Sequence, residues 1–179
     1  MIYTVEEALT VGQPDEVWDR WTSEMKPVSD LLAVPGFNTA QRFKGLALDP
    51  SPSLALYSID SADVLQSRPY LDGAGGGKLG TPKWGKHLSF WHRNLFTGLD
   101  RAPAVPEDSR LLVIDSREPD VVIDGLSITW LSVVGLDRTT PCRGLAIIDK
   151  AVADSYLSTP LAHVRVFAPR MAQAVSSRA

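Results

Sequence analysis

The alternation of strand-like and helix-like segments constrains the fold of this chain more than any other feature. Runs rich in β-branched and apolar residues predict strands at residues 2–11, 37–48, 54–60 and 87–96. Segments between them predict helices at residues 14–25 and 61–70. Pro14 suits the first turn of the first helix, and Ser61 can cap the second. The short turn between the second and third strands predicts an antiparallel hairpin.

The resulting order, β-α-β-β-α-β, is that of a ferredoxin-like unit. A second series follows, with a short helix predicted at 149–157 and strands at 111–115, 127–134, 143–148 and 163–168. The segment 117–125 is too short and too rich in helix-breaking residues for a full helix, so this half is predicted to be trimmed. We therefore predict an α+β protein with tandem ferredoxin-like halves, at residues 1–100 and 110–179, joined by a linker at 101–109.

The uncovered sheet faces predict how the two halves meet. A sheet with helices on one face must also bury its other face. If the halves press their bare antiparallel sheets together, they form a barrel, a pseudo-dimer within one chain, with an apolar pocket between the sheets. The run 54–59 is apolar on both faces, which suits a strand covered on both sides.

Charge and cysteine content narrow the function classes. The formal net charge is -3 and the sequence pI is about 5.6, which argues against nucleic acid because phosphate binding needs a concentrated basic surface. Cys142 is the only cysteine, so no internal disulfide can form. No signal segment opens the chain, and no run approaches the roughly 20 apolar residues of a membrane span. We expect a cytoplasmic protein that binds neither nucleic acid nor membrane.

The stretch from Trp18 to Phe43 carries a family resemblance. It combines a leading helix with Trp18, Trp21, Glu24 and Met25, the run Leu-Leu-Ala-Val-Pro-Gly-Phe at 31–37, and a strand with Ala40, Arg42 and Phe43. This pattern resembles the EthD-like branch of the dimeric α+β barrel superfamily. The resemblance implies ferredoxin-like units that pair sheet to sheet around a cavity. It also implies the family's range of activities, which includes cofactor-free monooxygenases, cyclases, isomerases, lyases and dehydratases. Many relatives have a histidine just before the 31–37 run, whereas residues 25–30 here contain none.

The strand at residues 87–94 holds the densest group of candidate catalytic residues. His87, Trp91 and Arg93 share one face of this strand, and His92 and Asn94 share the other. Either histidine could act as an acid–base residue near neutral pH, and Arg93 could stabilise an enolate or phenolate. The sequence does not decide which face of this strand lines the cavity.

Several aromatic and basic residues on other strands are candidates for substrate contacts. Tyr57 could donate a phenolic proton as a catalytic residue, and Tyr3 could bind substrate, although core packing is the commoner role of such tyrosines. Arg42 lies mid-strand among apolar neighbours and needs an anionic partner, either Asp60, Glu24 or a ligand. Trp91 and Trp130 come from opposite halves and could sandwich an aromatic ring, or could simply pack.

Other ligand classes fit the sequence less well. His163 opens the last strand and could reach the cavity, or it could be a surface residue at a strand end. The histidines show no metal-ligand spacing, so we expect no metal, with a site using Asp60 or Asp149 as the alternative. The glycine-rich run before Lys78 lacks the Ser or Thr of a phosphate loop and suits a flap over the cavity better.

Together these features predict a cofactor-independent enzyme, with no bound cofactor and a small-molecule substrate. The substrate is expected to be apolar and aromatic or polyketide-like, as in aromatic compound catabolism. The expected chemistry is proton transfer, in an isomerase, a dehydratase or a lyase. The alternatives are a cofactor-free monooxygenase of phenols and a non-catalytic binding protein. Two chains could pair further as a homodimer.

Overall fold

The computed structural model describes residues 1–9, 28–47, 52–74 and 88–177. Its helical segments are α2 (Val28–Leu32), η1 (Ala62–Gln66), η2 (Tyr70–Ala74) and α4 (Lys150–Ser158). Its strands are β1 (Ile2–Leu9), β2 (Phe37–Gly45), β3 (Ser53–Ile59), β4 (Leu88–Thr97), β5 (Ser109–Ser116), β6 (Thr129–Leu136), β7 (Cys142–Asp149), β8 (Val164–Pro169) and β9 (Ala174–Val175). The helix predicted at 14–25 lies outside the described residues.

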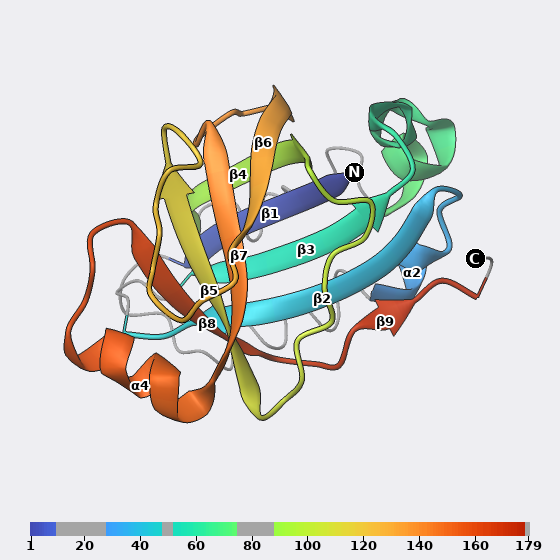
Figure 1. Ribbon diagram of the computed structural model, residues 1–179. Coiled ribbons are helices and arrows are strands. Elements are labelled where there is room, and N and C mark those ends of the chain that lie inside the picture. Colours follow the sequence, from blue (N-terminus) through green and yellow to red (C-terminus); the bar gives the residue numbers. More distant parts are fainter. Residues whose placement is uncertain (10–27, 48–51, 75–87, 178–179) are drawn as a thin grey trace.

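Strands β1 to β8 form a closed antiparallel barrel (Figure 1). Their order around the barrel is β3-β1-β4-β6-β7-β5-β8-β2, and β2 pairs with β3 to complete the ring. Within the first hundred residues the strand order is β2-β3-β1-β4, and within the second half it is β6-β7-β5-β8. The β4–β6 and β2–β8 pairs join the two halves. The prediction of an antiparallel barrel is therefore confirmed.

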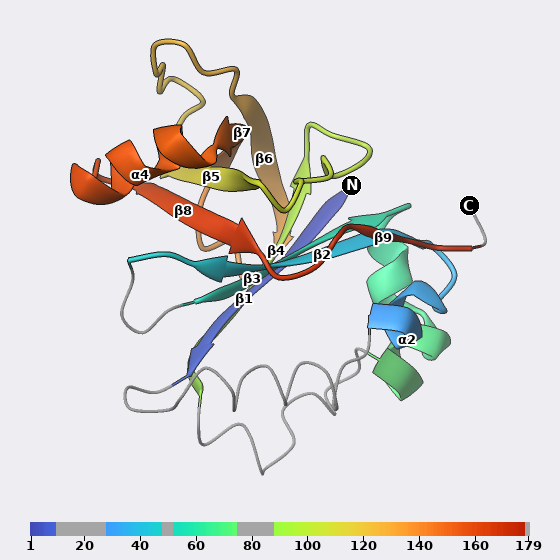
Figure 2. The ribbon, with the colours of Figure 1, turned by 90° about the horizontal axis from the view of Figure 1, so that it is seen from below.

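Helical segments lie on the outside of the barrel, on opposite sides of the molecule (Figure 2). α4 packs against β5, β7 and β8, and α2 packs against β2. Ser61 does cap a helix, since its Oγ accepts a hydrogen bond from the Asp63 backbone N–H at 3.3 Å. The capped segment is, however, a short 3-10 turn followed by a separate turn at Tyr70–Ala74, in place of the single helix expected at 61–70. No described helix is both long and apolar enough to cross a membrane.

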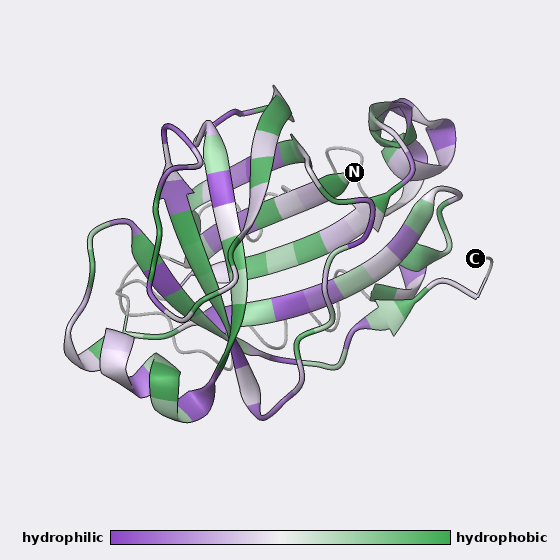
Figure 3. Cartoon of the chain, in the orientation of Figure 1, coloured by the Kyte–Doolittle hydropathy of each residue, from purple (hydrophilic) through white to green (hydrophobic). Residues whose placement is uncertain are grey.

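The barrel interior is a packed core, which corrects the expectation of an apolar pocket between the sheets. Alternating inward positions from both halves fill it, and hydrophobic residues dominate the middle of the strands (Figure 3). Most of these side chains are almost fully inaccessible to solvent. They are Ile2, Phe43, Leu54, Leu56, Phe96, Ala102, Val105, Leu111, Val113, Leu131, Leu145 and Phe167. Large side chains point inward from both halves, so little space is left in the middle of the barrel.

The segment predicted as a linker contributes to one end of this core. The Ala102 backbone N–H donates to Ser58 Oγ at 2.8 Å, and the Val105 N–H donates to Gln41 Oε1 at 3.0 Å. The Gln41 side-chain amide donates in return to the Val105 carbonyl at 2.8 Å. These bonds satisfy buried polar groups and hold Ala102 and Val105 in the core.

Candidate functional site

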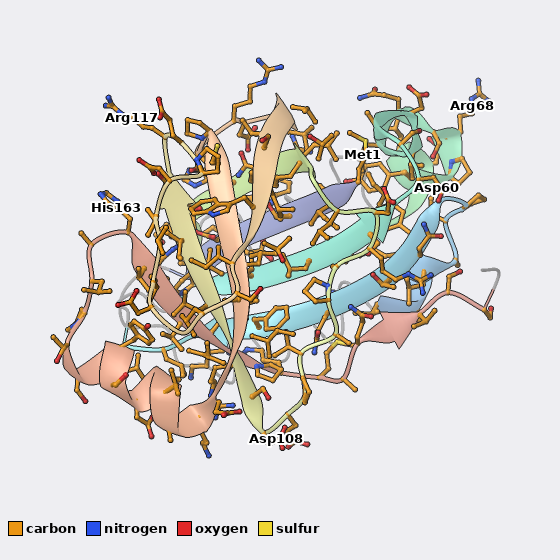
Figure 4. All side chains as sticks on the ribbon, in the orientation of Figure 1. Met1, Asp60, Arg68, Asp108, Arg117 and His163 are labelled. Atoms are coloured by element: carbon orange, nitrogen blue, oxygen red, sulfur yellow. The ribbon has the colours of Figure 1, made fainter. Side chains whose placement is uncertain are left out.

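A cavity of about 710 Å³ opens at one end of the barrel, and we call it the barrel mouth. Figure 4 labels two of the residues that line it, Arg117 and His163, which lie on the same side of the molecule. This volume is in the range of binding sites for small organic molecules. The ionisable residues of the lining, within the described ranges, are Glu6, His92, Asp115, Arg117, Arg143, His163 and Arg165.

Strand alternation explains why charged side chains reach the interior at this end. On β5 the inward positions are Leu111, Val113 and Asp115, and they change from apolar to charged toward the strand end. Across the β5–β7 pair, Val113 lies opposite Leu145 and Asp115 lies opposite Arg143. Because opposite residues share a face of the sheet, the apolar core ends in a charged layer.

Glu6, Asp115, Arg143 and Arg165 form an ion-pair tetrad in this charged layer. Arg165 donates from Nη1 to Glu6 Oε1 and from Nη2 to Asp115 Oδ2, both at 2.5 Å. Arg143 donates from Nε to Asp115 Oδ1 at 2.7 Å and from Nη2 to Asp115 Oδ2 at 3.0 Å. Arg143 Nη2 also lies 3.6 Å from Glu6 Oε2. The tetrad links β1 of the first half to β5, β7 and β8 of the second.

Arg165 stays charged although it is partly buried. Burial alone would lower the pKa of Arg165, but Glu6 and Asp115 outweigh it and raise that pKa above its ordinary value. The guanidinium of Arg143 lies over the Phe96 ring at 5.5 Å, and that of Arg165 lies over Phe167 at 5.4 Å. The mouth thus has a floor of aromatic rings beneath fixed charges.

His92 is the candidate acid–base residue that the structure places in the barrel mouth. It lies on β4 directly opposite Glu6 of β1. Its ring is solvent-exposed and stacks on Phe90 at 5.1 Å with an interplanar angle of 26°. Residues opposite each other in an antiparallel pair have Cβ atoms about 4.5–5.5 Å apart, so the side chains of His92 and Glu6 leave their strands side by side on the same face of the sheet.

His163 lines the same cavity from the opposite half of the chain. It is exposed and has a left-handed backbone with a φ of 65° just before β8. Its carbonyl accepts a hydrogen bond from the Asp115 backbone N–H at 3.1 Å. The position combines the two roles considered for this residue, since it stands at a strand end and also faces the mouth.

Five of the predicted site residues lie on the other, helix-side face of the first-half sheet. Tyr3 and Tyr57 stack at 5.5 Å in a buried cluster, and the Tyr3 and Tyr70 hydroxyls are 3.1 Å apart. Trp91 packs against this cluster. Arg42 is buried and interacts with the Tyr57 phenol. These residues form a packed aromatic layer apart from the barrel mouth.

The environment of this layer keeps the phenols protonated. Burial is the main reason that the pKa of Tyr57 is raised, and Arg42 offsets it only in part. Burial also raises the pKa of Tyr3 well above its ordinary value, with the nearby Tyr70 adding to the effect. Arg93 belongs to the same face, with its guanidinium 5.2 Å from the centre of the Trp91 ring.

The structure separates the two tryptophans that were considered as a sandwich for an aromatic ring. Trp130 packs against the cluster beneath α4, whereas Trp91 packs against the aromatic layer, so the two indoles do not sandwich a ligand. Asp60 accepts a hydrogen bond from Asn38 at 2.7 Å. Arg42 interacts with the Tyr57 phenol, and Glu24, the other partner considered for Arg42, lies outside the described residues. Strand alternation puts the two tryptophans on outer faces of different halves.

Two predictions concern residues that lie outside the described ranges. His87 and the glycine-rich run at 75–78 are not described, so their predicted roles stay predictions. Within the described residues, no group of three or more His, Cys, Asp or Glu side chains could hold a metal ion.

The residues of the tetrad were missed as site candidates by sequence reasoning. Their signal was a charged residue at an inward position of an otherwise apolar strand, as with Asp115 after Leu111 and Val113. A lone charge of this kind is normally read as an exposed strand end, and only the partner strands distinguish the two cases.

Comparison with known proteins identifies the fold. No family model matches the chain, and no curated protein matches it significantly. Among the solved structures that resemble it are three that match over almost its full length. An anthrone oxidase-like protein has a TM-score of 0.60 at 12% identity, covering 98% of this chain and 94% of that protein. A proposed monooxygenase from Lactobacillus acidophilus NCFM has a TM-score of 0.53 at 8% identity, with coverages of 98% and 96%. A proposed chlorite dismutase has a TM-score of 0.53 at 14% identity, with coverages of 95% and 95%.

The chain has a dimeric α+β barrel fold. At these identities the resemblance concerns the fold alone.

Proposed function

We propose that the protein is an enzyme that removes a proton from a small, electron-rich carbonyl or phenolic molecule bound in the barrel mouth. The observation that carries the proposal is that His92 and Glu6, opposite each other on neighbouring strands, both line a cavity of about 710 Å³. A histidine beside a carboxylate is a common acid–base pair, because the carboxylate orients the imidazole and stabilises its protonated form.

The position of His92 suits proton transfer to a bound molecule. Its ring is exposed, so a ligand can reach it. Glu6 is 7% exposed and is held by its hydrogen bond from Arg165, so the carboxylate on the strand opposite His92 has a fixed position. A fixed base beside a bound molecule lowers the entropic cost of the reaction. In this proposal the side chains themselves supply the acid–base chemistry, and no cofactor is needed.

Proton removal leads to two reaction classes: proton-transfer reactions, such as isomerisation and dehydration, and oxygenation. Removal of a proton next to a carbonyl yields an enolate, and return of the proton at another carbon is an isomerisation. Loss of a neighbouring hydroxide is a dehydration. If the enolate or phenolate instead reacts with O2, the outcome is oxygenation. The resemblance to an anthrone oxidase-like protein and to a proposed monooxygenase supports this second class to a comparable degree.

We further propose that the barrel is a tandem pseudo-dimer of EthD-like, ferredoxin-like halves. The support is the equivalent strand order in the two halves, β2-β3-β1-β4 and β6-β7-β5-β8. The mouth then lies where the halves meet, since Glu6 and His92 come from the first half and Arg143 and Arg165 from the second.

Anthrone is a suitable first probe, because its reaction separates the two classes. In the oxygenase reaction, anthrone and O2 yield anthraquinone and water, and the ring CH2 carbon becomes a carbonyl. Under argon in D2O, the same base exchanges the CH2 protons for deuterium without oxidation. We expect exchange to be faster with the wild-type protein than with His92→Gln, as followed by NMR.

The outcomes decide between the alternatives. Exchange with O2 uptake and anthraquinone formation supports an oxygenase, and exchange alone supports an isomerase, a dehydratase or a lyase. Small phenols and cyclic diketones extend the test to other members of the class. If every compound that binds shows neither exchange nor turnover above the His92→Gln rate, the enzyme proposal is wrong and the cavity belongs to a binding protein.

A further inference from the structure

We infer that Arg143 is the anchor for an anionic oxygen of the ligand, so that the barrel mouth selects phenolates and enolates over neutral molecules. The inference rests on the proposed function in that both use the barrel mouth, and it specifies the substrate class of that site.

Two of the three guanidinium nitrogens of Arg143 donate hydrogen bonds to the tetrad, and the third does not. Its Nε and Nη2 both donate to Asp115, at 2.7 and 3.0 Å. Its Nη1 is buried and has no hydrogen-bond partner among the described residues. A buried donor without an acceptor is unfavourable, so a ligand oxygen that reaches Nη1 gains more than it would in water.

Arg165 is a contrasting arginine within the same tetrad. Both of its terminal nitrogens are occupied, Nη1 by Glu6 and Nη2 by Asp115. Arg143 is also the more buried of the two, with 3% of its side chain exposed against 20% for Arg165. Both arginines line the mouth, but only Arg143 keeps a terminal nitrogen that the carboxylates of the tetrad do not engage.

The charge around Arg143 suits an anion. The two carboxylates and two arginines of the tetrad cancel, so an incoming anion meets no net negative charge there. Among the residues that the structure describes, the other ionisable groups that line the mouth are His92, Arg117 and His163, which can only add positive charge. Phe96 lies beneath the Arg143 guanidinium, and such an apolar floor strengthens a hydrogen bond to a charged oxygen.

Proton transfer gives this anchor a chemical role. As His92 takes a proton from a phenol or from the carbon beside a carbonyl, negative charge develops on the oxygen of the ligand. An oxygen held at Arg143 Nη1 would gain a charge-assisted hydrogen bond as that charge develops. Such a donor favours the deprotonated state over the neutral substrate, which is the condition for catalysis.

The test uses 4-nitrophenol, whose deprotonated form is coloured, and 4-nitroanisole, which has the same ring but cannot ionise. The wild-type protein should bind the nitrophenolate about tenfold or more tightly than nitroanisole, and should lower the pKa of the bound phenol. Binding is followed by absorbance and by the NMR signal of His92. Since the chain has three histidines, comparison with His92→Gln assigns that signal.

Arg143→Lys and Arg165→Lys are matched variants. Each replaces a guanidinium that lies against the Glu6 and Asp115 carboxylates with an ammonium group of the same charge. We expect Arg143→Lys to weaken nitrophenolate binding by about tenfold or more, and Arg165→Lys to have a clearly smaller effect. Equal losses in the two variants would show that only the overall charge matters, and would overturn the assignment of the anchor to Nη1.

Two further outcomes would overturn the inference. If Arg143→Lys does not fold, the wild-type titrations still decide, because equal affinity for nitrophenolate and nitroanisole excludes an anion anchor. Failure of the nitrophenolate to shift the His92 signal would place the ligand elsewhere and also overturn the inference. No turnover enters this test, so a protein that binds nitrophenolate through Arg143 but exchanges no protons contradicts only the proposed function.

Discussion

Glu6 on β1 accepts a hydrogen bond from Arg165 on β8, with 2.5 Å between Oε1 and Nη1 and 159 positions between them in the sequence. The two strands belong to different halves and are not neighbours in the sheet. The bond therefore crosses the barrel interior at its mouth. It joins the halves by a contact that the backbone pairing does not provide.

The first prediction concerns the stability of this contact. Arg165→Met should lower the free energy of unfolding by about 3–5 kcal/mol, because it leaves the partly buried Glu6 and Asp115 carboxylates without one of their cations. Urea denaturation followed by circular dichroism measures the loss. Arg117→Met, an exposed change at the same mouth, should stay within about 0.5 kcal/mol of the wild type. A similar small effect for Arg165→Met would mean that the tetrad adds little to stability.

The second prediction separates the two histidines of the mouth. His92→Gln should lower the rate of proton exchange or turnover by about 10²- to 10⁴-fold while leaving the unfolding midpoint nearly unchanged, since the ring is exposed. His163→Asn should keep most of the activity, and asparagine tolerates the left-handed backbone at that position. Loss of activity in His163→Asn alone would reverse the assignment of the acid–base residue.

The third prediction is a loss of stability at alkaline pH. The raised pKa values of Tyr3 and Tyr57 mean that the folded protein keeps these phenols protonated above the ordinary value of 10.0. The unfolded chain releases those protons from about pH 10, so the free energy of unfolding falls as pH rises above that value and is unaffected below it. Urea midpoints between about pH 8 and pH 11 give the slope.

Tyr57→Phe provides the control for this pH dependence. It removes one of the two phenols, so the decline above about pH 10 should be shallower than in the wild type. A wild-type midpoint that stays level through this range would contradict the burial of neutral phenols in the aromatic layer.

The fourth prediction compares two glycines with positive φ. Gly98 has a φ of +114°, and a Cβ there would lie 2.6 Å from the Trp130 carbonyl oxygen. Gly125 has a φ of +79°, with open space around the same position. Gly98→Ala should therefore cost at least about 3 kcal/mol, and Gly125→Ala only about 1 kcal/mol. Both free energies of unfolding are measured by urea denaturation. Equal losses would show that the positive φ alone causes the destabilisation, and that β4 and β6 can move apart to accommodate the added Cβ at residue 98.

The strand pattern was largely readable from the sequence, because side chains that alternate between two faces leave a period of two. The strands predicted at 37–48 and 143–148 correspond to β2 and β7, with ends that differ by a few residues. The helix at 149–157 was also predicted within one residue of α4. The segment 61–70 was not, since Ser61 signals where a turn begins and not how long the helix continues.

The candidate site was only partly predictable. Alternation separated His92 from Trp91 and Arg93, but it could not say which of the two faces was inside the barrel. Tyr3, Tyr57 and Arg42 were named as site residues because they are polar or aromatic groups on apolar strands. The structure places them together in a packed layer on the helix side, apart from the barrel mouth.

The sequence by itself determined the strands β1 to β8 and the antiparallel barrel, since both follow from local periodicity and from the need to cover a sheet on two faces. Only the tertiary structure decided that the interior is filled with side chains and that Glu6, Asp115, Arg143 and Arg165 meet at the barrel mouth. The physical reason is that these contacts join strands far apart in the chain. Their register depends on how the barrel closes, and no local pattern of residues records that closure.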